Sequence, residues 1–185
     1  NELLMKIVNG GGPSGFYFAV TPLRPLEISG IEPWQHVGPF AGGDLNKAFD
    51  KVFPPEIKID LAEAYEAGKL KRKSQPDWKD GTAHNDKLKG TNCANYLFRV
   101  IKSDKPQVLK LSLGSDDGIK VWVNGRSVLS KKVGRNVAAA GQENVGRPRA
   151  GHPSDGRPSP YALTPPNGSN PWYPLAGGGS GRAFA

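Results

Sequence analysis

The sequence predicts an all-β fold: an antiparallel, jelly-roll-like β-sandwich with a disordered Gly/Pro-rich C-terminal tail. Three observations lead to this prediction. Short segments that alternate apolar and polar residues are separated by turn sequences, which is typical of an antiparallel sandwich. Residues 115–128 contain every part of a β-hairpin. Residues 146–185 are too rich in glycine and proline for a packed core.

The hairpin has the sequence SDDGIKVWVNGRSV and begins with a tight turn at Asp116-Asp117-Gly118. The strand that follows has two different faces, an apolar one with Ile119, Val121 and Val123 and a more polar one with Lys120 and Trp122. Asn124-Gly125 is a pair that accepts the positive φ angles of a type I′ turn. The return strand is predicted to start at Ser127–Leu129.

Four further segments have the composition of strands, namely residues 3–8, 16–20, 94–101 and 108–113. Gly10-Gly11-Gly12-Pro13 separates the first two, and a turn over Lys102–Gln107 separates the last two. Aromatic residues at irregular spacing mark residues 34–53. Residues 77–90 are polar and contain the turn Asp80-Gly81, so a loop is predicted there.

The segment around Asp60 has two interpretations. Asp60 and Glu63 have the spacing of a capping box, which predicts a short helix over residues 60–65. Residues 57–61 alternate apolar and polar positions, which predicts a strand instead. Gly68 and the basic residues after it would end either element soon.

Composition divides the chain into four parts. Residues 1–20 hold two strands, residues 21–33 form a linker with three prolines, residues 34–145 form the sandwich, and residues 146–185 form the tail. The tail has eight Pro and eight Gly in forty positions, and Leu163 and Leu175 are its only aliphatic residues larger than Ala. Such a segment cannot bury enough apolar surface to offset its chain entropy, so we expect it to be mobile and dispensable.

Charge and cysteine content exclude several classes of protein. The formal net charge is +8, but the lysines are spread out, with one run at Lys69–Lys73 and no aromatic-rich basic motif, so no nucleic-acid partner is predicted. Cys93 is the only cysteine, which rules out an intrachain disulfide and a haem-attachment motif. No apolar run approaches the roughly 20 residues of a membrane helix. The chain starts at Asn1 inside a strand-like segment, so we expect it to be a fragment.

A series of short motifs, in a fixed order, carries a family resemblance. The series contains W-x-x-x-G-P-F from Trp34, F-P-P-E from Phe53, W-K-D-G from Trp78, Y-L-F from Tyr96 and S-D-D-G from Ser115. It resembles the accessory β-sandwich modules of large exported bacterial proteins, which often stand beside carbohydrate-active or cytochrome-c-like domains. The hairpin is similar to that of protective-antigen-type and galactose-binding-like domains. The resemblance implies an exported protein with a carbohydrate ligand.

The order of the motifs leads to a prediction about the first twenty residues. Modules of this kind continue through an Arg-containing loop, here Val133-Gly134-Arg135, and G-Q-E, here Gly141–Glu143, into a closing pair of strands. Nothing after Val145 has that closing pattern. Two interpretations of the tail are open: it is a genuine part of the protein, or it is translated out of frame. Residues 1–20 do have it, as if they ended a preceding repeat. We therefore predict that residues 3–8 fold back and pair with strands drawn from residues 94–133, as in a circular permutant.

The acidic turn is the candidate metal site. Adjacent carboxylates such as Asp116 and Asp117 can present hard oxygens to Ca²⁺, and relatives suggested by the resemblance bind Ca²⁺ through such a pair. The alternative is that the two residues only form and cap a turn. Asn124 lies at the far end of the strand, too far to share that ion.

Three residues after the acidic turn are candidate ligand contacts: Trp122 and Lys120 on the strand, and Asn124 at its far end. Trp122 stacks on a sugar ring in one interpretation and covers the sheet in the other. No catalytic motif is present, so the chain is not predicted to be an enzyme. The sequence predicts a non-catalytic binding or adhesion module, with carbohydrate as the ligand. The alternative is a structural spacer that packs against a neighbouring catalytic or cytochrome-c-like domain of the same polypeptide.

Overall fold

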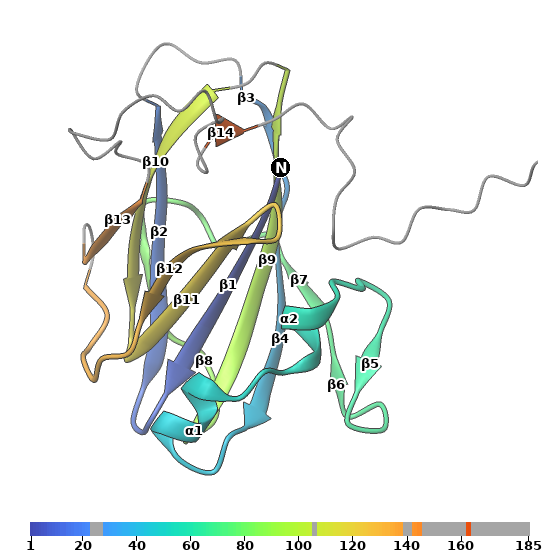
Figure 1. Cartoon of the computed structure of the whole chain (residues 1–185), viewed down its shortest axis with the longest axis vertical. Helices are drawn as coiled ribbons and strands as arrows, with labels where there is room; N and C mark the ends of the chain where they lie inside the picture. The colour runs from blue at the N-terminus through green and yellow to red at the C-terminus, as the bar shows by residue number, and fades with distance from the viewer. Residues whose placement is uncertain (23–27, 105–106, 139–141, 146–161, 164–185) are drawn as a thin grey trace, which may run out of the picture.

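The structure, a computed structural model, describes residues 1–22, 28–104, 107–138, 142–145 and 162–163. Within them the chain forms a seven-stranded and a five-stranded antiparallel sheet that pack face to face, with two short helices (Figure 1). The predicted all-β sandwich is confirmed. Of the predicted linker at residues 21–33, residues 23–27 lie outside the described residues, whereas Thr21 and Pro22 end one strand and residues 28–31 form another, so this part of the linker prediction is wrong. The predicted tail at residues 146–185 lies outside the described residues except for two positions. Within the tail Ala162–Leu163 is described, and it forms a short strand.

The larger sheet, sheet A, has the strand order β12-β11-β1-β9-β4-β7, and β3 also pairs with β9. Its strands are β1 (Glu2–Asn9), β3 (Ile28–Ile31), β4 (Trp34–Ala41), β7 (Lys73–Gln75), β9 (Cys93–Ser103), β11 (Gly118–Val123) and β12 (Arg126–Lys131). Strand β1 lies near the middle of the sheet, antiparallel to β11 on one side and to β9 on the other. The prediction that residues 3–8 pair with strands from residues 94–133 is therefore confirmed.

The smaller sheet, sheet B, has the order β13-β10-β2-β8, with β14 also paired with β10. Its strands are β2 (Ser14–Pro22), β8 (Ala83–Leu88), β10 (Gln107–Ser115), β13 (Glu143–Val145) and β14 (Ala162–Leu163). Strand β2 lies between β10 and β8. The first two strands of the chain thus belong to different sheets, and the short turn between them links the two halves of the sandwich.

The main core lies between the sheets. Alternate residues of each strand point into it, as the pleat of a strand requires. Strand β1 contributes Leu3, Met5 and Ile7, and β11 contributes the apolar face predicted for the hairpin. From sheet B the core receives Phe16, Phe18, Leu109, Leu111 and Leu113.

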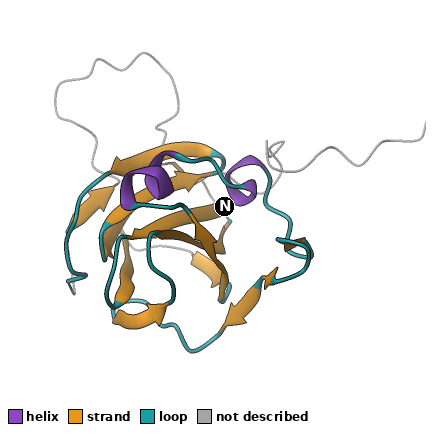
Figure 2. Ribbon diagram, turned by 90° about the horizontal axis from the view of Figure 1, so that it is seen from below, coloured by secondary structure: helices purple, strands orange, loops and turns teal. Residues whose placement is uncertain are grey.

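A third layer covers the outer face of sheet A. It consists of α1 (Leu45–Asp50), α2 (Pro54–Ile57) and the small hairpin of β5 (Ala64–Tyr65) and β6 (Leu70–Lys71). Both helices lie on the same side of the strands (Figure 2). A second core forms beneath this layer from Leu4, Val8, Phe40, Phe49, Phe53, Tyr96 and Phe98, among others. Because β1 is buried on both faces, it reads as a nearly continuous apolar run rather than an alternating one.

Several local predictions are wrong. Residues 60–65 form no helix, and residues 57–61 form no strand: Ile57 ends α2 and β5 begins only at Ala64. The Asp60 carboxylate instead accepts a hydrogen bond from the Ala62 N–H, so it caps a bend between them. The polar segment 77–90 contains β8, an edge strand whose outward residues are polar. Residues 34–53, whose aromatic spacing is irregular, likewise contain regular elements, β4 and α1.

Candidate functional site

Asp117 ties together three segments of the chain. Its φ angle of +60° places it in the left-handed region, which orients the carboxylate toward two neighbouring loops. Oδ2 accepts the Gly10 N–H at 2.7 Å and Oδ1 accepts the Arg135 N–H at 3.0 Å. The Asp117 N–H in turn donates to the Arg135 carbonyl at 2.7 Å. The carboxylate therefore joins the β1–β2 turn, the β10–β11 turn and the loop after β12.

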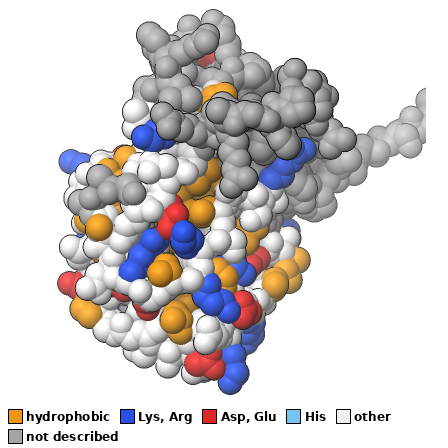
Figure 3. Space-filling model, turned by 60° about the vertical axis from the view of Figure 1, so that its left-hand side comes forward, with side chains coloured by type: hydrophobic (Ala, Val, Ile, Leu, Met, Phe, Trp, Pro, Cys, Tyr) orange, Lys and Arg blue, Asp and Glu red, His pale blue; other side chains and the backbone are white. Residues whose placement is uncertain are grey.

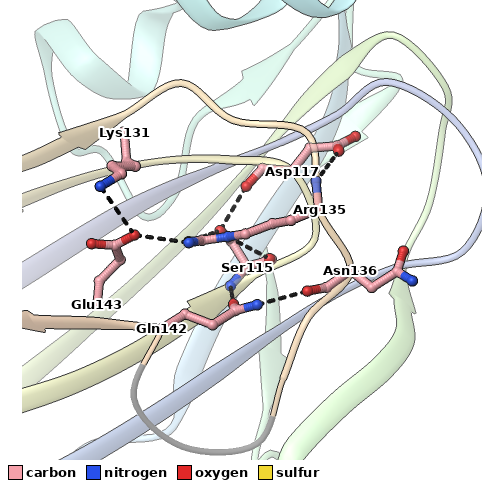
Figure 4. A network of polar contacts seen from close by, with 7 residues as sticks. All are labelled: Ser115, Asp117, Lys131, Arg135, Asn136, Gln142 and Glu143. Atoms are coloured by element: carbon pink, nitrogen blue, oxygen red, sulfur yellow. Dashed lines mark hydrogen bonds and ion pairs between the residues drawn. The ribbon is translucent and has the colours of Figure 1, made fainter.

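Arg135 extends this connection into a network that we name the turn clasp: Ser115, Asp117, Arg135, Gln142 and Glu143 (Figure 4). The Arg135 guanidinium pairs with Glu143 at 2.8 Å and donates to the hydroxyl and the carbonyl oxygen of Ser115. Gln142 accepts the Ser115 N–H. The clasp thus gathers three motifs of the sequence resemblance, S-D-D-G, the Arg-containing loop and G-Q-E, at one end of the sandwich.

Asp116 has a different environment from Asp117. Its backbone N–H donates to Gly15, and the residue is 8% exposed. No described residue donates a hydrogen bond to its carboxylate. Burial raises the pKa of Asp116 to about 6, and the negative charges of Asp117 and Asp86 add to the shift. The fold therefore disfavours the ionised form of the Asp116 carboxyl.

The fit of this turn to Ca²⁺ is limited. Ca²⁺ takes six to eight oxygen ligands, whereas both Asp117 oxygens already accept backbone N–H groups. Within the described ranges, no three His, Cys, Asp or Glu side chains are grouped as they would be around a metal ion. The geometry favours a structural use of Asp117. Calcium binding by Asp116 and Asp117 stays a prediction.

Replacing Asp116 should stabilise the protein only above the pH at which the carboxyl ionises. Below about pH 4 the group is protonated in the folded and the unfolded chain, so it makes no difference. Because its folded-state pKa is raised to about 6, the unfolded chain loses the proton first, and stability falls as pH rises between these two values. Asp116→Asn should match the wild type in urea unfolding at low pH and exceed it by about 1–2 kcal/mol at pH 8. An equal difference at both pH values would contradict this account.

The three predicted ligand contacts do not form one group. Asn124, with φ of +48°, forms the expected turn with Gly125, but its side chain binds the start of β1: Oδ1 accepts the Glu2 N–H and Nδ2 donates to Asn1. Lys120 and Trp122 lie on the outer face of sheet A. The Lys120 ammonium lies 4.6 Å from the centre of the Phe49 ring. Trp122 is partly buried against the second core.

A buried lysine is the most prominent polar feature that the sequence analysis missed. Lys6, in the middle of the apolar segment LLMKIV, is fully buried and donates to the carbonyls of Phe49 and Lys51 and to Glu56 at 2.8 Å. The Tyr96 hydroxyl donates to the same carboxylate oxygen at 2.5 Å. Burial lowers the pKa of Lys6, and Glu56 opposes that shift. The triad of Lys6, Glu56 and Tyr96 fixes the helical layer to the centre of sheet A.

A second buried cation, Arg99, lies on β9. The Arg99 guanidinium stacks 4.4 Å from the centre of the Trp34 ring, donates twice to the Glu32 carbonyl and forms an ion pair with Asp80. Its charge is fully paired, so the arrangement supports packing. The available signal for both buried cations was that each interrupts an apolar run, Lys6 in LLMKIV and Arg99 in YLFRVI.

The face of the molecule shown in Figure 3 carries basic and acidic side chains next to one another among hydrophobic ones. Lys132 pairs with Asp50, and Lys131 lies 3.9 Å from Glu143. Exposed pairs of this kind contribute at most about 1 kcal/mol each. Among the described helices, none has the length and apolar character needed to cross a membrane.

Comparison with protein-family models, with curated proteins and with solved structures found no match for this chain.

Proposed function

We propose that the chain is a non-catalytic, carbohydrate-binding module of an exported protein, and that it binds its ligand on the outer face of sheet A. The observation that carries this proposal is the position of Trp122. It lies on that face, partly buried, at the end of β11 opposite to the one on which α1 packs. A partly exposed indole offers a flat apolar surface on which the C–H face of a sugar ring can stack.

Helix α1 does not cover the Trp122 end of β11. Phe49 of α1 packs so closely on Gly118, at the other end of β11, that a Cβ there would lie 2.7 Å from its ring. In Figure 1, α1 lies at the lower end of β1, away from the chain start to which Asn124 is bonded. Trp122 is therefore supported from one side by the second core and remains accessible from the other.

The interior of the sandwich is not suited to a sugar. A cavity between the sheets, at the ends of β1, β10 and β11, has a volume of about 20 Å³ and an apolar lining. Ligand pockets usually have volumes of about 300–1,000 Å³. This cavity is too small for a sugar ring, so the proposal assigns the ligand to the surface.

A glycan array tests the proposal with two tryptophan variants. Trp122→Ala should weaken glycan binding about tenfold, because a stacked aromatic contact contributes about 0.5–1.5 kcal/mol beyond the area that it buries. Trp78→Ala is the matched control, since Trp78 is also partly buried but packs against the core between the sheets. An array repeated with Ca²⁺, with a chelator, and with Asp116→Asn tests the calcium prediction. Glycan binding that survives in Trp122→Ala would contradict the assigned face.

A second candidate function is that of a spacer that packs against a neighbouring domain. Three large hydrophobic residues of the helical layer favour it: Val52, Ile57 and Leu61 are 59%, 70% and 49% exposed. Single exposed residues are ordinary, but three within ten positions are typical of a contact surface. If this candidate is right, no glycan binds, and Ile57→Ser loosens the contact with the adjoining domain in the longer polypeptide.

A further inference from the structure

The side chain of Arg72 is the one buried cation among the described residues whose donors have no acceptor. Its Nε and both terminal nitrogens are inaccessible to water and form no hydrogen bond. The guanidinium carbon lies 5.9 Å from the centre of the Phe98 ring, which supplies only a weak cation–π contact. Lys6 and Arg99, by contrast, are fully paired. A desolvated guanidinium without an acceptor costs several kcal/mol, so this position is complementary to an anion.

A second unpaired group lies beside it. The Tyr65 hydroxyl is buried without a hydrogen-bond partner. Burial raises its pKa, and the charge and the N–H donors of the nearby Arg72 oppose that shift, although the two side chains do not meet the geometric limits of a hydrogen bond. The carboxylates of Asp60 and Glu63 also lie near enough to influence Tyr65, but Asp60 pairs with Lys58 and neither forms an ion pair with Arg72. Arg72 and Tyr65 therefore offer several hydrogen-bond donors in one place.

The location of this pair connects it with Trp122. Trp122, Leu4 and Phe98 are in register on β11, β1 and β9, on the same face of sheet A. Two strand spacings, about 10 Å, separate the first from the last. Arg72 lies over Phe98, between β6 and the edge strand β7. A ligand longer than one sugar ring therefore has the length to span from the indole to the guanidinium, but Leu4 and Phe98 between them are buried beneath the covering layer.

We propose that Arg72 and Tyr65 form a receptor for the carboxylate of an acidic sugar, such as a uronic acid, in a glycan that also contacts Trp122. A carboxylate matches the planar fork of a guanidinium and binds it through two parallel hydrogen bonds, and a phenol hydroxyl adds a third. The basic run Lys69–Lys73 and the net charge of +8 attract an anionic polymer to this edge. The inference rests on the proposed function and names its ligand class.

Access requires the β5–β6 hairpin to move. In the described part of the chain, this hairpin pairs only with itself and belongs to neither large sheet. Its turn holds Glu66 and Ala67 with positive φ angles of 51° and 54°, which L-residues adopt at a cost. The hairpin is therefore tied to the sandwich through side-chain packing rather than through a sheet, and its Tyr65 lies beside the Arg72 side chain.

The test follows the side-chain Nε–H signal of Arg72 by NMR in the full chain, titrated with sodium glucuronate, sodium acetate and glucose. Both carboxylates should shift the signal saturably and glucose should not. Arg72→Gln should lose at least tenfold in affinity for uronate-containing glycans, because it removes the charge-assisted hydrogen bonds to the carboxylate. Arg126→Gln, which removes an exposed arginine on β12, is the control for loss of charge and should bind as the wild type does.

Stability gives an independent readout. Arg72→Met removes an unpaired buried charge, so it should raise the midpoint of urea unfolding without ligand, whereas Arg135→Met breaks a paired charge and should lower it. A lower midpoint for Arg72→Met would show that Arg72 serves the fold and overturn the proposal. Binding of neutral glycans with no response of Arg72 would overturn this inference and leave the proposed function standing. A response of Arg72 to carboxylates without any glycan binding would overturn the assignment to a sugar and the proposed function together.

Discussion

Deletion of residues 1–20 should unfold the protein. The segment contributes a strand within each sheet, β1 between β11 and β9 and β2 between β10 and β8. Eight of its apolar side chains are at most 7% exposed: Leu3, Leu4, Met5, Ile7, Val8, Phe16, Tyr17 and Phe18. Each large apolar side chain contributes roughly 1.5–3 kcal/mol on burial, and together they match the whole stability of a domain, about 5–15 kcal/mol.

Circular dichroism and urea unfolding measure the effect of this deletion. A chain that ends at Leu163 is the control, because the sequence predicts residues 164–185 to be dispensable and the deletion keeps β14. Addition of a peptide with residues 1–22 should restore the β-sheet signal of the shortened protein by strand complementation. A cooperatively folded chain without residues 1–20, or a peptide with no effect, would contradict the assigned role of β1 and β2.

Replacement of Lys6 by alanine should destabilise the protein by about 3–5 kcal/mol, because it leaves the carboxylate of Glu56 buried without its cation. The Phe49 and Lys51 carbonyls would also lose their common donor. The helical layer is attached to sheet A through these groups, so its amides should lose protection first. The measurement is urea unfolding combined with amide hydrogen exchange.

Lys120→Ala provides the matched control for Lys6. The two lysines are in register on neighbouring strands and face the same way, but Lys120 is only partly buried and forms its contact with a ring face. Its loss should cost less than about 1 kcal/mol. The double variant Lys6→Met with Glu56→Gln should recover part of the lost stability, since it removes both charges together. Equal effects of Lys6→Ala and Lys120→Ala would show that the triad does not hold the layer.

Strands that are marked by a local sequence pattern could be predicted from the sequence. Alternation and the Asn124-Gly125 pair define the hairpin, and both turn residues do have positive φ angles. The pairing of residues 3–8 is predicted because no closing strand pattern follows Val145 in the sequence. The helical layer could not be predicted in the same way, because α1 and α2 are only six and four residues long and depend on tertiary contacts.

The roles of charged residues are even less visible in the sequence. The pair Asp116-Asp117 reads the same whether its oxygens accept backbone N–H groups or bind a metal; only the positions of Gly10 and Arg135 distinguish the two. Lys6 does interrupt an apolar run, so a buried lysine could have been inferred there. Nothing local to Arg72 separates it from the exposed lysines on either side, because its burial depends on Phe98, 26 positions away.

The first strands of this chain complete its own sandwich. Native-state amide hydrogen exchange tests this claim most directly. The amides of residues 4–7 are expected to exchange as slowly as those of their partners on β9 and β11, at the rate set by global unfolding. Exchange of residues 4–7 at the rate of an exposed chain, while β9 and β11 stay protected, would contradict it.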